Sequence, residues 1–599
     1  MRYLSSTGVV RGLLVVVALG ASLAAATGFA GQVFTGPTAG EPAGDSDLER
    51  PFPPAFVPPK QPGSEQWSMP HLWERRPSFP YLPGEDRGAS RSIGGVVHGH
   101  LVHSVQIPQP HPALTFLDVQ YERRLFYTTD RMRDLVVEAA NYVREKYPHA
   151  VLRLGNFGNP GGGDIPYSVS HNSGRDADLG FYVKGPDGEM AAPADLVPLD
   201  AHGRYEGEEG TFIFEPKRNW RLIEGLIVHG GDQLQYIFVS NSLRRQLLRR
   251  AREVGAAAKI RRRAKALLHQ PYGSLPHNDH FHIRLYCSRI DVQSGCWDRG
   301  TKHSWYDSHA DAERRTVREA RKALRAGRSS IRAAAARRLG LLEDEGSAGE
   351  LREVLDDPSP TVRAAAARAL ASVDAGADAL VARLEEEEAG QVYLELVDAL
   401  ARVGGPDAAR ALTRELDEAR RLELPGRYRT DARTFVAEAL IRLESAHPVD
   451  ALVELLDAER ADVRAASARA LRYLTNHDFG GRWRADESKW SAALAEWRGW
   501  LSEHGDEPRD AWLREGFERH GFEVERLDGH HVWSLCRAIK NEDFLSHNAQ
   551  RILMRISGRQ PESLSWPKED ASFYWRRWFE RRRHRFGAPP IPEELSTLE

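Results

Sequence analysis

The sequence has few cysteines and no excess of charge of either sign. Three cysteines in 599 residues are too few for a fold held together mainly by disulfides. Lysine and arginine number 82 against 85 aspartates and glutamates, a formal net charge of −3, so the chain lacks the basic excess typical of nucleic-acid-binding proteins. We therefore expect no nucleic acid among its partners. A mean hydropathy of −0.51 also excludes a polytopic membrane protein.

Long uncharged apolar runs are scarce, and the clearest one lies at the N-terminus. Arg2 and Arg11 precede an uncharged stretch over residues 12–30 that ends in small residues. This pattern is typical of an export signal, so residues 1–30 are predicted to be a cleaved signal peptide. The stretch is also about long enough to cross a bilayer, at ~20 residues, which leaves an uncleaved anchor as the alternative. Both interpretations place the rest of the chain outside the cytoplasm, in the periplasm or an equivalent space.

The chain is too long for one compact core, and its composition changes along its length. Eight prolines fall between Pro37 and Pro62, which favours extended backbone, so residues 31–66 are predicted to be a proline-rich linker. Residues 67–300 are rich in glycine, histidine and aromatics. The short apolar runs at 234–239 and 281–285 predict strands, and residues 132–146 predict a helix. This segment is therefore expected to be an α+β domain.

The second half of the chain repeats itself. After a linker predicted at residues 301–325, residues 326–590 are rich in alanine, leucine, arginine and glutamate, and near copies of one motif begin at Ile331, Val362 and Val463. The equivalent leucines are 31, 30, 40 and 31 residues apart: Leu339, Leu370, Leu400, Leu440 and Leu471. A period of this size predicts a helical solenoid, and the pattern resembles HEAT repeats. We expect a multi-domain protein whose α+β domain is followed by an all-α HEAT-like solenoid that binds a protein partner.

Two short blocks in the α+β segment carry candidate metal ligands. A catalytic zinc ion takes three protein ligands, commonly imidazole nitrogens or carboxylate oxygens, and leaves a position for water. In the first block His171 and Asp178 are seven residues apart, and Gly174 between them allows the chain to turn back. In the second block the predicted strand places His280 and His282 on one face. One of that pair could bind the metal while the other faces its water.

Each spacing alone is weak evidence, because histidines with purely structural roles are common. The two blocks together, with a third histidine at His277 in the second block, favour a metal site over a group of structurally satisfied histidines.

The motif H-x6-D followed by H-x-H resembles the peptidases grouped around lysostaphin, the D-Ala-D-Ala metallopeptidases and the penicillin-insensitive murein endopeptidase. The segments SHNSGRDADLGFYV and PHNDHFHIRLYC are similar to the last of these. The resemblance covers about residues 67–300 and does not extend to the solenoid. It implies an α+β zinc metallopeptidase domain that binds one zinc ion through His171, Asp178 and His282. By the same analogy, His280 and His277 are catalytic side chains beside the bound water.

The resemblance also implies the reaction. Zinc lowers the pKa of a bound water toward ~7 and polarises a peptide carbonyl, and His280 or His277 could accept the proton or stabilise the oxyanion. The expected activity is hydrolysis of peptidoglycan cross-links, with the bond from D-alanine to meso-diaminopimelate favoured. A D,D- or L,D-carboxypeptidase of the same fold is one alternative. The other is a non-catalytic envelope scaffold that uses the solenoid for protein binding.

Two further features depend on the compartment and on charge. Cys287 and Cys296 are nine residues apart and are expected to form a disulfide in an oxidising space, with two reduced thiols as the alternative. Cys536 is expected to be a buried free thiol. Arginine runs, including Arg576-Arg577 and residues 581–585, are predicted to be solvated helix faces, with attraction to anionic wall polymers or lipid head groups as the alternative.

Overall fold

The structure is a computed structural model that describes residues 79–596 except for 209, 272–276, 374–375, 418–420, 425–427, 482 and 484–489. The predicted signal peptide at residues 1–30 and the predicted linker at residues 31–66 lie outside the described residues. Among the helices of the described part, none combines the length and the apolar character needed to cross a membrane.

The N-terminal domain is built around a six-stranded sheet with the order β13-β12-β14-β7-β6-β4. Its strands are β4 (Leu114–Phe116), β6 (Leu152–Leu154), β7 (Asp176–Gly180), β12 (Leu234–Phe238), β13 (Leu268–His269) and β14 (His280–Leu285). The two strands predicted from apolar runs are therefore confirmed as β12 and β14. They pair antiparallel, and β14 also pairs antiparallel with β7, so β14 lies in the interior of the sheet.

Helices α3 (Asp130–Lys146), α4 (Pro216–Gly230), α5 (Asn241–Glu253) and α6 (Ala258–Leu267) bury apolar residues in the core of this domain. The short helix α2 (Asp118–Arg123) buries the polar residue Gln120 instead. Helix α3 confirms the predicted helix; Thr129 caps it by accepting a hydrogen bond from the Met132 N–H. Helix α4 begins with a proline in its first turn and is capped by Glu215. The two helices pack on each other.

Smaller elements surround the sheet. These are β1 (Arg91–Gly94), β2 (Gly99–Val102), β3 (Val105–Gln106), β5 (Tyr127–Thr128), β8 (Val183–Lys184), β9 (Met190–Ala191), β10 (Arg204–Gly207), β11 (Gly210–Phe214) and α7 (Arg289–Val292). The predicted disulfide is present, because Cys287 and Cys296 are bonded on either side of α7. Residue Cys296 also bridges to Gly94 of β1. The disulfide thus holds the chain that leaves β14 against the start of the domain.

The second half of the chain is a helical solenoid, which we define as helices α8 to α24. It contains α8 (Ala310–Ala323), α9 (Ser329–Leu341), α10 (Ala348–Glu353), α11 (Pro360–Ser372), α12 (Ala377–Glu386), α13 (Gly390–Val403), α14 (Gly405–Arg414), α15 (Ala432–Leu443), α16 (Val449–Glu454), α17 (Ala461–Thr475), α18 (Ser491–His504), α19 (Arg509–Arg519), α20 (Val532–Ala538), α21 (Asp543–Ser557), α22 (Lys568–Glu580), α23 (Arg583–Phe586) and α24 (Glu593–Ser596). The predicted fold class, an α+β domain followed by an all-α solenoid, is confirmed.

The repeat read from the leucine spacing matches the helices. Leu339, Leu370, Leu400, Leu440 and Leu471 are fully buried, one in each of α9, α11, α13, α15 and α17, and these helices pack in succession. Small residues permit the close approach: a Cβ added at Gly340 would lie 2.8 Å from the Cα of Ala369. The longer interval between Leu400 and Leu440 contains the hairpin of β15 (Arg421–Leu424) and β16 (Tyr428–Asp431).

The structure changes the description of residues 301–325, which the sequence suggested were a linker. Residues 310–323 form helix α8, and Ala320 and Leu324 are buried in the same core cluster as Leu339. The solenoid therefore starts earlier than expected, because α8 covers the first face of α9.

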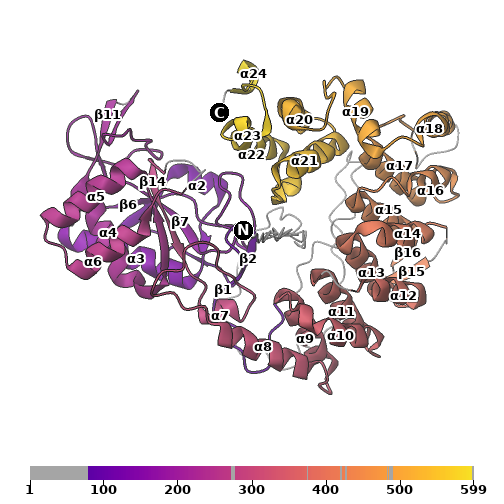
Figure 1. Ribbon diagram of the computed structural model, residues 1–599, viewed down its shortest axis with the longest axis horizontal. Coiled ribbons are helices and arrows are strands. Elements are labelled where there is room, and N and C mark those ends of the chain that lie inside the picture. The colour runs from indigo at the N-terminus through magenta and orange to yellow at the C-terminus, as the bar shows by residue number, and fades with distance from the viewer. Residues whose placement is uncertain are drawn as a thin grey trace, which may run out of the picture.

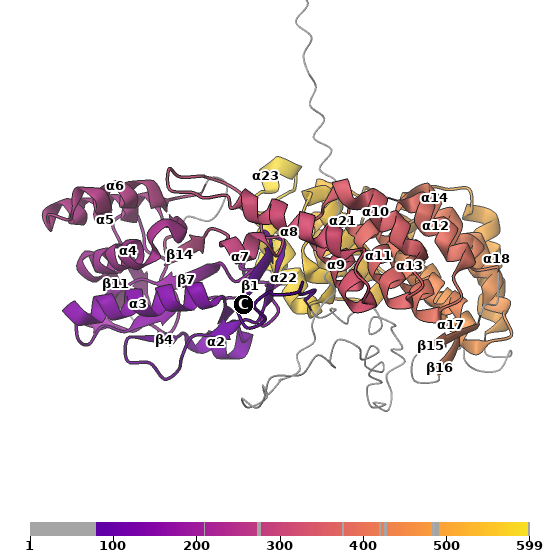
Figure 2. The same ribbon diagram turned by 90° about the horizontal axis from the view of Figure 1, so that it is seen from below.

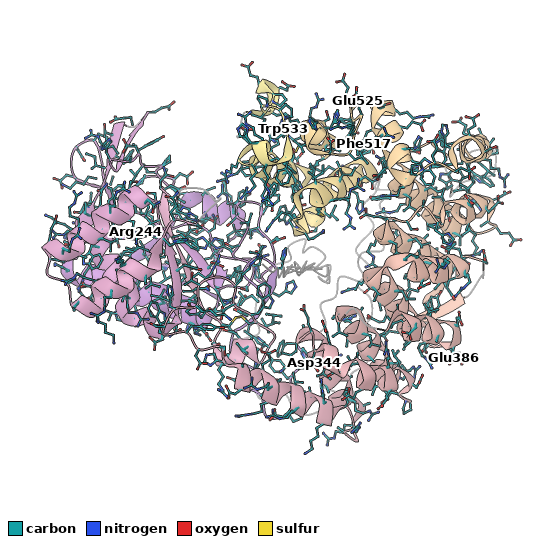
Figure 3. All side chains as sticks on the ribbon, viewed as in Figure 1. Arg244, Asp344, Glu386, Phe517, Glu525 and Trp533 are labelled. Carbon is teal, nitrogen blue, oxygen red and sulfur yellow. A yellow bond between two sulfur atoms is a disulfide. The ribbon has the colours of Figure 1, made fainter. Side chains whose placement is uncertain are left out.

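The solenoid curves so that both of its ends contact the N-terminal domain. Figure 1 shows it leaving through α8, turning through α13 and α18, and returning with α22 beside that domain, and Figure 2 shows the same closure from below. The last helices have a separate core that contains Phe517, Trp533 and the predicted buried thiol Cys536; the first two are labelled in Figure 3. Trp575 and Trp578 are also buried there.

A buried ion pair forms the first junction between the two parts. Arg338 of α9 is fully buried and its Nη2 lies 2.6 Å from Oε2 of Glu85. The same guanidinium donates hydrogen bonds to the backbone carbonyls of Pro80 and Gln293. The start of the solenoid is thus tied to two segments of the N-terminal domain.

Replacing Arg338 with leucine is expected to destabilise this junction, because Glu85 and two carbonyls lose their donor. Breaking a buried pair costs about 3 kcal/mol, measurable as a lower midpoint of urea unfolding. The control is Arg321→Leu. Its ion pair with Asp344, a residue labelled in Figure 3, has side chains that are 34% and 21% exposed, so its loss should cost under about 1 kcal/mol. If the two variants lose the same amount of stability, the Arg338–Glu85 pair does not have the proposed role at the junction.

Candidate metal centre and catalytic site

The pairing of β7 with β14 assembles most of the site. His282 lies opposite Asp178, Arg284 opposite Asp176 and His280 opposite Gly180. Because side chains alternate along a strand, these acidic and basic groups share one face of the sheet. Phe281 and Ile283 point the other way and are fully buried in the core.

His171 reaches this face from the loop that leads into β7. Its backbone has φ +83°, a left-handed conformation that is costly for a residue with a Cβ and is found mainly where the surroundings enforce it. Gly174, the residue expected to permit the turn, has φ +70° and accepts hydrogen bonds on its carbonyl from Thr128 and Thr129. The loop is therefore fixed, and His171 is fully buried beside Asp178.

Three side chains converge with the spacing of ligands around one ion. Asp178 Oδ1 lies 3.0 Å from His282 Nδ1 and 3.3 Å from His171 Nε2. Bond lengths of about 2.0–2.1 Å in a tetrahedral zinc site place neighbouring ligand atoms about 3.3 Å apart. The ligand atoms of His171, Asp178 and His282 all lie within 4.8 Å of one another. The three expected ligands therefore come together.

The hydrogen bonding of His171 also fits a metal. Neither nitrogen of its ring makes a hydrogen bond of normal geometry within the described part of the chain, although the ring is fully buried. Buried polar atoms are normally satisfied. A divalent cation bound to the imidazole would satisfy one of these nitrogens, so the donor set fits such an ion.

Two residues that the sequence reasoning missed hold the candidate ligands in place. Asp176 Oδ1 lies 2.7 Å from His282 Nε2 and accepts a 2.6 Å hydrogen bond from Arg284 Nε. A carboxylate of this kind fixes which nitrogen of a histidine faces a metal. Asn156 donates a 3.0 Å hydrogen bond to Asp178 Oδ2. The alternation Asp-x-Asp before Gly180 could have revealed Asp176, whereas nothing in the sequence pointed to Asn156.

The site keeps its carboxylates ionised despite burial. Burial raises the pKa of Asp176, but Arg284 and His282 overcome that effect and leave it below its usual value. Burial likewise raises the pKa of Asp178, and the facing His171 and His280 bring it well below the usual range. Burial lowers the pKa of His282, and its hydrogen bonds to Asp176 and Asp178 raise it above normal. Both carboxylates are therefore available as anionic ligands or acceptors.

The two remaining histidines lie beside this group. His280 Nε2 is 3.3 Å from Asp178 Oδ1, and its Nδ1 is 2.8 Å from Asp279 Oδ1. Burial lowers the pKa of His280, but the charges of Asp178 and Asp279 raise it well above its usual value. The His277 ring centroid is 5.3 Å from that of His280 and 5.6 Å from that of His282. Nitrogens of these three histidines form a second compact group, so all five predicted site residues are brought together.

The geometry has a counterpart among known proteins. Residues 92–304 match the family model of penicillin-insensitive murein endopeptidase. Residues 317–392 match the family model of HEAT repeats. The resemblances predicted from the sequence are confirmed in both halves, and the first match supports a peptidase that acts on murein.

Comparisons with whole proteins add little to this. No curated protein matches the sequence. The CpcE–CpcF complex of phycocyanin lyase from Nostoc sp. PCC7120 has a TM-score of 0.27 at 19% identity, over 47% of this chain and 95% of that chain. An engineered protein has a TM-score of 0.23 at 14% identity, over 61% of this chain and 85% of that chain.

Replacing Asp176 with asparagine is expected to weaken metal binding by roughly 10–100-fold, because His282 loses the anionic partner of its Nε2. Competition with a chromophoric chelator measures the affinity directly. The control is Asp200→Asn, since Asp200 only accepts backbone hydrogen bonds in an exposed turn. An unchanged affinity in Asp176→Asn would contradict the positioning role.

Proposed function

We propose that the protein is an exported, zinc-dependent endopeptidase that hydrolyses cross-link peptide bonds in peptidoglycan. The observation that carries the proposal is the convergence of His171, Asp178 and His282 within the segment that matches the murein endopeptidase model. The bond favoured by that resemblance joins D-alanine to meso-diaminopimelate. We propose that the catalytic domain spans residues 67–300 and that the helical repeats span residues 326–590.

In this proposal His171, Asp178 and His282 hold one zinc ion. The ligand spacing and the lack of hydrogen bonds on the His171 ring support this assignment. Zinc bound there would supply Lewis acidity, lowering the pKa of a water toward ~7 and polarising the peptide carbonyl. Asp176 keeps the Nδ1 of His282 directed to the ion by binding its Nε2.

His280 is the proposed proton carrier. Asp279 Oδ1 lies 2.8 Å from its Nδ1, and its Nε2 lies 3.3 Å from the oxygen of Asp178. A histidine in this position can take a proton at Nε2 and return it to the leaving amine. His277, whose ring contacts those of His280 and His282, is proposed as the second catalytic histidine and orients the carbonyl oxygen.

The remaining parts of the proposal concern location and partners. A wall substrate requires export, which accords with the signal sequence proposed for residues 1–30. If that segment stays uncleaved, it would anchor the protein to the membrane. The solenoid is proposed to bind a protein, as helical repeats present extended surfaces suited to this.

The function is tested by incubating the protein with purified sacculi, with and without a chelator, and identifying the soluble products by mass. The expected result is chelator-sensitive loss of dimeric muropeptides with matching gain of monomers. Release of free D-alanine would instead identify a carboxypeptidase. Binding without any new product in the presence of zinc would identify a scaffold.

Substituting His280 with alanine is expected to lower the rate of cross-link cleavage by about 10²–10⁴-fold, the usual contribution of a positioned acid–base group. Zinc content and thermal stability should stay near those of the unmodified protein, because His171, Asp178 and His282 remain. His530→Ala is the control, since that side chain is 58% exposed on the solenoid. Full activity in His280→Ala would contradict its assigned role.

A further inference from the structure

The returning end of the solenoid packs beside the candidate site. The Phe573 ring of α22 lies 6.3 Å from the ring of Tyr167, in the loop that leads to His171. Burial and the charge of Asp570 in the same helix raise the pKa of the Tyr167 hydroxyl, and Arg123 at the end of α2 stacks on the Tyr167 ring at 3.8 Å. Figures 1 and 2 both show α22 next to this side of the N-terminal domain. The second junction is therefore made at the loop that carries a candidate ligand.

The contact face of α22 continues into two arginines. Phe573, Arg577 and Arg581 follow one another at intervals of four residues, so they share one face of the helix and its C-terminal end. Arg577 Cζ lies 5.7 Å from the Phe573 ring centroid. Burial lowers the pKa of both arginines, and the charge of the Asp279 carboxylate opposes this lowering in each. Asp279 Oδ1 lies 2.8 Å from Nδ1 of His280, and Phe573 on the same helix face as the arginines contacts Tyr167, so this face of α22 lies on the side of the domain that carries the candidate site.

This cluster has more positive charge than the protein neutralises. Within the described residues, neither arginine has a carboxylate at ion-pair distance, and Asp279, whose charge acts on both, already contacts His280. Desolvation lowers the pKa of Arg577, and the neighbouring Arg123 lowers it further. Desolvation and the charges of Arg577 and Arg582 lower the pKa of Arg581. An anionic ligand would relieve this repulsion.

A carboxylate is the anion that best matches both the two arginine guanidinium groups and the substrate of the proposed reaction. The planar guanidinium donates paired hydrogen bonds that match a carboxylate. In a bond from D-alanine to diaminopimelate, the carbon attached to the scissile nitrogen carries a free carboxylate. Arg577 is half-buried and Arg581 is exposed, so a bound peptide could reach both. This assignment replaces the expectation that these arginines form only a solvated helix face.

We propose that Arg577 and Arg581 bind the free carboxylate of the diaminopimelate residue beside the scissile bond, so that the last long helix of the solenoid completes the substrate site. The proposal rests on the proposed endopeptidase function. It gives the solenoid a role in substrate specificity that is separate from binding a protein partner.

The test compares two cross-linked muropeptide dimers that differ only in whether this carboxylate is free or amidated. The full-length protein is expected to cleave the free form with a kcat/KM roughly ten-fold or more above that of the amidated form, the size of one lost charge-assisted pair. In the double variant Arg577→Gln/Arg581→Gln, kcat/KM for the free form should fall to that of the amidated form. The value for the amidated form should stay unchanged.

The matched control is Arg585→Gln, an exposed arginine of α23 that should keep the full preference. Binding gives a second readout that needs no turnover. In the His280→Ala background, calorimetry should show affinity for the free dimer weakened by roughly ten-fold on adding the two glutamines. If the double variant fails to fold, the exposed Arg581→Gln alone should remove part of the preference.

Four outcomes would overturn the inference. If the double variant keeps the preference for the free carboxylate, the arginines do not bind this group. If it loses activity equally on both dimers, the arginines only stabilise the junction. If it gains activity on both dimers, α22 covers the site. If the unmodified protein cleaves neither dimer, the proposed function is wrong. The carboxylate site is tested separately by calorimetry: it is wrong if the two glutamine substitutions leave the affinity for the free dimer unchanged.

Discussion

The register between β7 and β14 is the constraint on which the rest of the site depends. With His282 opposite Asp178 and Arg284 opposite Asp176, one face of a buried strand pair carries carboxylates and imidazoles at ligand spacing. A slip by one residue would turn these groups into the core and Phe281 out of it. The burial of Phe281 and Ile283 therefore fixes the polar site through the hydrophobic effect. The disulfide just beyond β14 holds the end of that strand.

Polar groups behind the candidate ligands are as well ordered as the ligands themselves. Asp176 satisfies both His282 and Arg284, and Asn156 satisfies the second oxygen of Asp178. One oxygen of Asp178 and both nitrogens of the His171 ring are among the buried polar atoms of the described site that still lack hydrogen bonds of normal geometry. The site is thus prepared for a cation, since the cost of burying these polar atoms is offset when one is bound.

The two halves of the chain are stabilised differently but are not independent. The α+β domain has its own core, and the solenoid is a series of similar layers whose alanines allow close packing. They meet at Arg338, where a buried charge finds its partner in Glu85. They meet again where Phe573 contacts Tyr167. A solenoid of this curvature brings α22 against the loop that leads to His171.

The sequence by itself determined the elements with strong periodicity and the identity of the chemical groups. The leucine spacing predicted the helices that bury Leu339 through Leu471, and the alternation around Phe281 predicted which histidines share a face, because both signals are local. The resemblance supplied the convergence of His171 with Asp178 and His282. Only the tertiary structure decided that residues 310–323 are helical and packed, that Asn156 supports Asp178, and that Phe573 contacts Tyr167. The last two contacts join residues 22 and about 400 positions apart, and no short-range pattern encodes a distance in space that depends on how the whole chain closes.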